Sequence, residues 1–121
     1  EARIGDLNYM QKFYIQADEG TAMDDLVDGL PFGEELRALI EEFNAGESLE
    51  ARLAHDADQL AFLIELKNLS DQGTTASADW MANVRQRLQT DIGHKLSDTI
   101  CTMPSDQWWR QKFIDRIDDN K

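Results

Sequence analysis

The chain has 121 residues, of which 41% are hydrophobic, so it is long enough for one globular domain with a modest core. Its formal net charge is −12, with 24 acidic against 12 basic residues, which argues against nucleic-acid binding through phosphate neutralisation. No apolar run approaches the roughly 20 residues of a membrane span, and the single cysteine, Cys101, excludes an internal disulfide. We therefore expect a cytoplasmic protein, folded as a single domain over residues 1–121, with neither nucleic acid nor membrane as a partner.

Helical periodicity recurs along most of the chain, and no segment shows sustained strand alternation. Residues 1–4 have the pattern of a last helical turn ended by Gly5, followed by a connection over 6–18. The pattern then predicts helices over about 21–29, 32–44, 48–71, 78–88 and 90–103. Ser48 is placed to cap the helix over 48–71, and Pro104-Ser105-Asp106 to cap a short last helix that carries Trp108 and Trp109. The predicted class is all-α, with the other helices packed around 48–71.

The central helix is predicted to be apolar on two faces, which is typical of the middle helix of a bundle. One stripe consists of Leu49, Leu53, Ala57, Leu60 and Ile64, and a second, on roughly the opposite side, consists of Ala51, Phe62, Leu66 and Leu69. Asp58 lies within the second stripe. Since a buried carboxylate must be paired, hydrogen-bonded or bound to a metal, we expect Asp58 to be buried and directed into a cavity.

Three possible metal ligands fall within four residues of this helix, namely His55, Asp56 and Asp58. His55 and Asp58, three positions apart, are neighbours on a helix and could share a metal. Two ligands do not make a site, however, and the only other histidine, His94, has polar neighbours and is expected on the surface. Asp56 falls near the first apolar stripe, so periodicity alone does not choose between Asp56 and Asp58.

Other chemistries find little support in the sequence. Cys101 follows Leu96 and Ile100 in an apolar helical pattern and is expected to pack in the core. No glycine-rich phosphate loop and no Gly-x-Ser-x-Gly elbow occur. The three tryptophans are expected at the core or its edge, although a pair such as Trp108 and Trp109 can also serve a dimer interface.

Four segments occur in a characteristic order: Glu1-Ala-Arg-Ile-Gly-Asp-Leu, Gly29-Leu-Pro-Phe-Gly-Glu-Glu, Leu53-Ala-His-Asp-Ala-Asp-Gln-Leu and Asp106-Gln-Trp-Trp. Together they resemble the second half of an HD-domain phosphohydrolase, and more narrowly the branch related to 5'-deoxynucleotidases. The resemblance extends from Glu1 to about Trp109. It implies an HD-like helical bundle of about five to six helices around residues 48–71, here without its N-terminal helices.

The resemblance also implies a set of site residues. The family's ligands are a first histidine, a His-Asp dipeptide and a distal aspartate, with a glutamate three residues after the dipeptide and then a Gly-Asp pair. Asp58 matches the distal aspartate and would bind a divalent cation, whether Mn, Co, Mg, Ni, Fe or Zn. Glu1 matches the glutamate and would orient the attacking water or transfer a proton, and Asp6 matches the pair and would position the nucleotide or leaving group. His55-Asp56 is not the dipeptide, because it lies where the distal aspartate's helix belongs.

The implied function is metal-dependent hydrolysis of nucleoside 5'-monophosphates to nucleoside and phosphate in the intact protein. The first histidine and the His-Asp pair would lie upstream of Glu1, so we expect the 121 residues alone, with one ligand of four, to be inactive. We expect the intact protein to form a homodimer or larger assembly. The 121 residues alone are expected to be unstable or to depend on a partner chain, because without the N-terminal helices one side of the helix over 48–71 is uncovered. The alternative is a non-catalytic helical interaction or regulatory module derived from an HD domain, and the residues before Glu1 would discriminate between the two.

Overall fold

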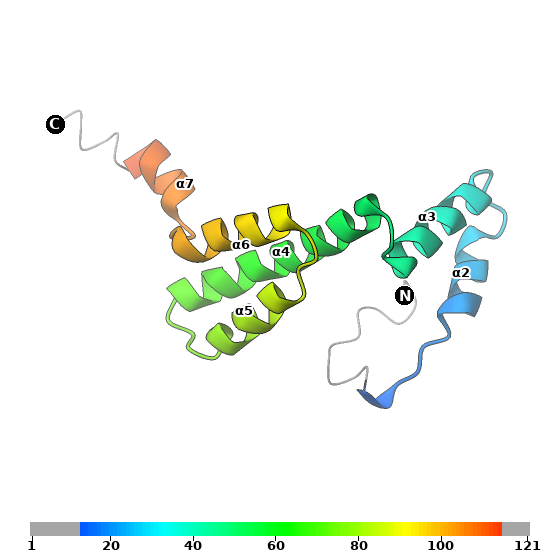
Figure 1. The fold of residues 1–121 in the computed structure, drawn as a ribbon, viewed down its shortest axis with the longest axis horizontal. Coiled ribbons are helices and arrows are strands. Elements are labelled where there is room, and N and C mark those ends of the chain that lie inside the picture. Colours follow the sequence, from blue (N-terminus) through cyan, green and yellow to red (C-terminus); the bar gives the residue numbers. More distant parts are fainter. Residues whose placement is uncertain (1–12, 115–121) are drawn as a thin grey trace. The chain divides into compact units, whose positions relative to one another are not determined.

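The computed structural model describes residues 13–114, and every element assigned there is a helix (Figure 1). These are α2 (Glu19–Val27), α3 (Gly33–Ala45), α4 (Leu49–Asp71), α5 (Ser77–Gln86), α6 (Asp91–Thr102), α7 (Gln107–Trp109) and the π-helical turn η1 (Arg110–Ile114). The predicted all-α class is confirmed. None of the described helices is both long and apolar enough to cross a membrane. The helical turn predicted over 1–4 and its end at Gly5 lie outside the described residues.

The chain divides into two compact units, with the boundary between Asn44 and Ala45 at the end of α3. Gly46 follows with φ of +66°, a conformation that glycine adopts without steric cost and that commonly ends a helix. The single domain predicted over residues 1–121 stays a prediction.

In the first unit, α2 and α3 form a helical hairpin. Asp18 caps α2, since its Oδ1 accepts from the Thr21 amide at 3.0 Å. At the junction between the two helices, a Cβ on Gly33, the first residue of α3, would lie 2.5 Å from the carbonyl oxygen of Val27, the last residue of α2. Arg37 on α3 donates to Asp24 on α2 at 2.7 Å. Glycine at position 33 and this ion pair therefore hold α2 and α3 together.

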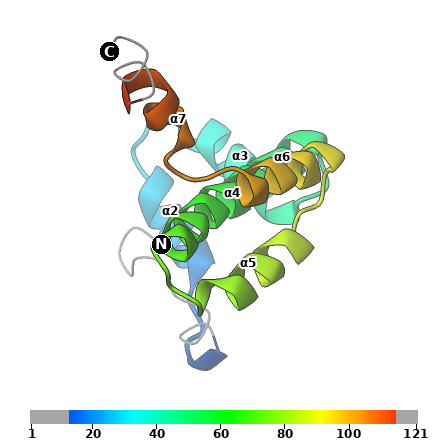
Figure 2. The same ribbon diagram turned by 90° about the vertical axis from the view of Figure 1, so that its left-hand side faces the viewer.

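In the second unit, α5 and α6 both pack along α4 (Figures 1 and 2). Ser48 caps α4 as predicted, because its Oγ accepts from the Ala51 amide at 3.1 Å. The core consists of Leu63 and Leu66 from α4 and Val84 from α5. Partly buried side chains pack against this core, and they are Leu60, Met81, Ile100 and Cys101. The packing role predicted for Cys101 is confirmed.

Only one face of α4 is buried, so the prediction of two buried apolar faces is wrong. Within the predicted second stripe, Leu66 is buried, whereas Phe62 and Leu69 are 42% and 45% exposed. The first stripe is mostly open, with Ile64 48% exposed, and only Leu60 of this stripe packs against the core. The reason is that α5 and α6 cover the side of α4 that is centred on Leu63, and Leu63 lies between the two predicted stripes.

The C-terminal end of the described chain is tied to α4 by a backbone contact. The Ser105 amide donates to Asp71 Oδ2 at 2.8 Å. Asp106 precedes α7, but its side chain makes no capping hydrogen bond and instead accepts from Arg110 Nε at 2.5 Å. The capping role predicted for this segment is therefore wrong in detail, although the short helix that it precedes is present.

Candidate functional site

Asp58 lies near the middle of α4 with its side chain exposed to solvent. The neighbouring Gln59 donates to its Oδ2 at 3.3 Å, a long contact between groups on the surface. The expectation that Asp58 is buried in a cavity is therefore wrong. The second stripe is only partly covered: Leu66 is buried in the core, whereas Asp58 lies at the edge of the stripe in solvent.

The buried carboxylate of α4 is Asp56, which is only 2% exposed. Its Oδ1 accepts from the Gln89 amide at 2.8 Å, while Oδ2 accepts from the Thr90 amide at 2.9 Å and from Thr90 Oγ1 at 2.5 Å. Thr90 is the N-cap of α6, and its Oγ1 in turn accepts from the Gly93 amide at 3.1 Å. Asp56 thus fixes the start of α6 against α4.

The electrostatics of Asp56 are those of a satisfied structural carboxylate. Burial acts to raise its pKa, but the hydrogen bonds from Thr90 and Gln89, together with the nearby His94, outweigh burial and hold the pKa below its usual value of 3.8. A Cβ on Gly93 would lie 2.3 Å from Asp56 Oδ2, so only glycine lets the first turn of α6 approach this closely. His94 itself is exposed, as predicted. Because hydrogen-bond donors already engage both oxygens of Asp56, we assign Asp56 a structural role. The clearest sign of this role in the sequence is the glycine in the first turn of the helix that follows Thr90.

Asp58 belongs to a largely apolar surface that we call the open face of α4. All its residues are exposed and lie on one side of the helix, namely Leu53, Ala54, Ala57, Asp58, Ala61, Ile64 and Glu65. The alanines let another backbone approach closely, and an exposed apolar helix face is typical of a surface that another element covers. Asp58 and Glu65 are the two carboxylates of this face. The Asp58 carboxylate therefore lies at the edge of an apolar packing surface, with its oxygen lone pairs exposed.

The described residues supply an incomplete donor set for a metal. Among residues 13–114 no group of three or more His, Cys, Asp and Glu side chains is placed to hold a cation. Asp58 offers a solvent-facing carboxylate, while Glu1 and Asp6 lie outside the described residues. The site predicted from Glu1, Asp6 and Asp58 therefore stays a prediction. Asp58 is a carboxylate of the kind that divalent cations bind.

Comparison with protein families places this helix in a known context. A sequence model of the HD domain matches residues 1–100, which include α2 to α5 and most of α6. The chain belongs to the HD domain family. HD domains are generally metal-dependent phosphohydrolases that bind divalent cations. Comparisons with curated proteins and with solved structures find no match.

Proposed function

We propose that this HD domain is part of a phosphohydrolase that cleaves nucleoside 5'-monophosphates and that Asp58 is a ligand of its divalent cation. The observation that carries the proposal is the position of Asp58 on the open face of α4, inside the region that matches the HD domain. A metal ligand on such a face acquires its partner ligands when the element that covers the face packs against it.

The two aspartates of α4 have separate roles in this proposal. Asp56 is committed to Gln89 and Thr90, so its oxygens are already engaged by donors. Among residues 13–114, only Gln59 donates to Asp58, at 3.3 Å, which leaves lone pairs of the carboxylate for a cation. By resemblance, Glu1 orients the attacking water or transfers a proton, and Asp6 positions the nucleotide or the leaving group.

A divalent cation in such a site polarises a phosphoryl oxygen and lowers the pKa of a bound water. The preference for nucleoside monophosphates rests on the resemblance to the 5'-deoxynucleotidase branch alone. The net charge of −12 also makes a positive cation useful, since an anionic substrate would otherwise be repelled by the surface.

The test compares three substitutions in the full-length protein. We expect Asp58→Ala to remove bound metal, measured by elemental analysis, together with phosphate release from a panel of ribo- and deoxynucleoside monophosphates. Glu1→Ala should leave the metal content nearly unchanged and lower turnover by roughly 10²–10⁴ if Glu1 does acid–base work. Glu65→Gln, on the same open face, is the matched control and should keep both properties.

The possible outcomes test the substrate, the metal ligand and the catalytic activity separately. Metal binding and hydrolysis of other phosphate esters, with no activity on nucleoside monophosphates, would retain the enzyme and overturn the substrate. Unchanged metal content in Asp58→Ala would remove Asp58 from the ligand set. Full-length protein that binds no divalent cation and hydrolyses no phosphate ester would support the non-catalytic module instead.

A further inference from the structure

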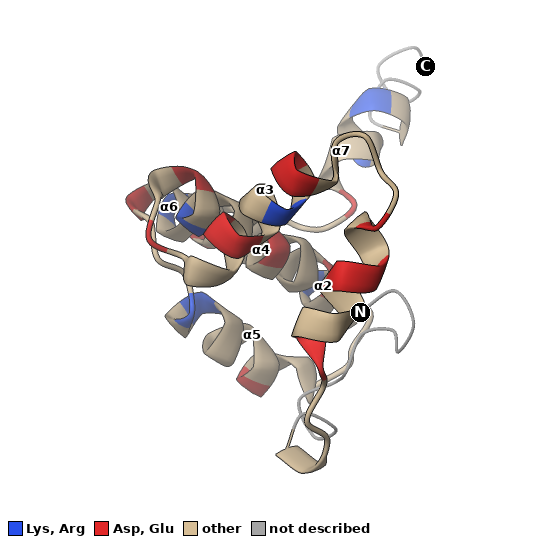
Figure 3. Cartoon of the chain, turned by 90° about the vertical axis from the view of Figure 1, so that its right-hand side faces the viewer, with Lys and Arg blue, Asp and Glu red and all other residues tan. Residues whose placement is uncertain are grey.

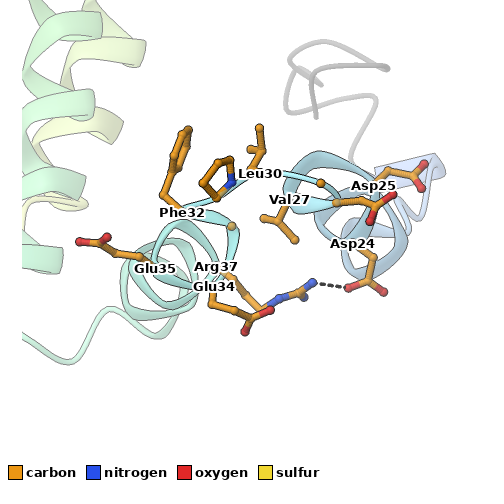
Figure 4. A pocket seen from close by; sticks show the side chains of 12 residues that line it. Asp24, Asp25, Val27, Leu30, Phe32, Glu34, Glu35 and Arg37 are labelled. Atoms are coloured by element: carbon orange, nitrogen blue, oxygen red, sulfur yellow. Dashed lines mark hydrogen bonds and ion pairs between the residues drawn. The ribbon is translucent and has the colours of Figure 1, made fainter.

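A groove between α2 and α3, within the first unit, has no role in the proposed hydrolysis. Its residues come from the end of α2, the connection that follows and the first turns of α3 (Figure 4). Val27 is the buried side chain at its base, and Leu30 and Phe32 are exposed along the connection, with Phe32 56% exposed. We call it the α2–α3 groove, defined by Asp24, Val27, Leu30, Phe32, Glu34 and Glu35.

The walls of this groove are held in place before any partner binds. A Cβ on Gly33 would lie 2.5 Å from the Val27 carbonyl oxygen, so the start of α3 is fixed against the end of α2. Arg37 and Asp24 join the two helices at 2.7 Å. Figure 4 shows Leu30 and Phe32 on one side of the connection and this ion pair on the other. A preformed groove of this kind costs less ordering free energy on binding than a flexible segment does.

Among the described residues that line the groove, acidic side chains outnumber basic ones. Five carboxylates line it, those of Asp24, Asp25, Asp28, Glu34 and Glu35, against the single guanidinium of Arg37. Arg37 is engaged by Asp24, whose hydrogen bond raises the pKa of the guanidinium. Residues 13–44 as a whole contain nine acidic residues and one basic residue, and Figure 3 shows red acidic segments on α2. The described residues that line the groove therefore combine the apolar Leu30 and Phe32 with an excess of negative charge.

We propose that the α2–α3 groove binds a basic segment of a partner protein, in which Lys or Arg residues flank an aliphatic or aromatic anchor. The anchor packs on Leu30 and Phe32, and the flanking cations meet the carboxylates of the two walls. Charge selects this occupant over the alternatives, because a second copy of this chain and a nucleic acid are both strongly anionic.

The test measures fluorescence anisotropy of a fluorescein-labelled, lysine-rich peptide with a central Leu-Phe pair. Two control peptides replace the pair by serines or the lysines by glutamates. We expect Phe32→Ser to weaken binding of the Leu-Phe peptide about tenfold, the loss typical of one interface anchor. Phe113→Ser is the matched control, since Phe113 is 54% exposed, and it should bind like the wild type.

A second pair of variants tests the charges. Glu34→Gln/Glu35→Gln should weaken binding several-fold and reduce its dependence on salt, whereas Glu65→Gln/Asp79→Asn removes two charges elsewhere and should do much less. Amide chemical shifts of Val27 and Gly33 in the wild type should move on titration with the Leu-Phe peptide, which tests the groove even if Phe32→Ser does not fold.

Two results would overturn the proposal. Equal affinities for the Leu-Phe and serine peptides would show only general attraction between a cation and an acidic protein. Equal behaviour of Phe32→Ser and Phe113→Ser, or unmoved Val27 and Gly33 amides, would place the binding outside the groove.

Discussion

Substitution of Asp56 by asparagine should destabilise the second unit far more than the same substitution at Asp58. Asparagine keeps one acceptor oxygen but turns an NH₂ group toward the donors of Gln89 or Thr90. A hydrogen bond to a charged group contributes about 1.5–3 kcal/mol, and a buried donor left without an acceptor costs about 1–3 kcal/mol. We therefore expect Asp56→Asn to lower the free energy of unfolding by roughly 2–4 kcal/mol.

The matched control is Asp58→Asn, because it changes the same residue type on the same helix and removes the same charge. Asp58 is exposed, and within the described part of the chain its side chain has only the 3.3 Å contact with Gln59, so the substitution should change stability by no more than about 0.5 kcal/mol. Urea denaturation followed by far-UV circular dichroism measures both variants. Equal unfolding midpoints for the two variants would refute the structural role assigned to Asp56.

The pH dependence of the Asp56 variant provides a second check. The pKa of Asp56 in the folded protein lies below its usual value of 3.8, so the ionised carboxylate stabilises the fold. That contribution is complete above the usual pKa and is lost as the pH falls through the lower value in the folded state. The stability difference between wild type and Asp56→Asn should accordingly be constant near neutrality and shrink below pH 3.8.

Three further predictions concern the same unit and the whole protein. Gly93→Ala places a Cβ 2.3 Å from Asp56 Oδ2 and should lower the free energy of unfolding, measured in urea, by roughly 1–3 kcal/mol. The control is Gly20→Ala in α2, whose Cβ would meet its nearest neighbour at 3.7 Å and which should be neutral or stabilising. Lys67 and the Ser105 amide hold the pKa of Asp71 at about 2. Lys67→Met should therefore raise the pH at which the Asp71 carboxyl carbon titrates by NMR. In the wild type, the stability that this carboxylate contributes should be lost as the pH falls from 3.8 toward 2. Sedimentation of the full-length protein should show a homodimer or larger assembly, and a stable monomer would contradict that expectation.

The helices could be predicted from the sequence because each depends on local signals. Ser48 and Thr90 cap α4 and α6 through their own side chains, and apolar spacing marks the rest of each helix. The cap expected of Asp106 failed because the carboxylate has a second option one turn away, the ion pair with Arg110. Local sequence patterns predict that a helix forms, but they do not show which of two nearby hydrogen-bond partners a side chain binds.

The buried face of α4 could not be predicted in the same way. The helix carries apolar side chains around most of its circumference, and periodicity does not show which of them α5 and α6 cover. The deciding contact for Asp56 joins it to Gln89 and Thr90, more than thirty positions away in the chain, as the separations of 33 and 34 show. Such a contact depends on tertiary packing, and only the glycine at position 93 hints at it in the sequence.

The central claim, that Asp58 is a metal ligand on the open face of α4, is tested most directly by anomalous scattering from crystals of the full-length protein grown with Mn²⁺. We expect an anomalous peak at a bonding distance of about 2.0–2.2 Å from an Asp58 carboxylate oxygen, together with ligands from outside residues 13–114. A bound cation whose ligands do not include Asp58, with the Asp58 side chain still in solvent, would contradict it.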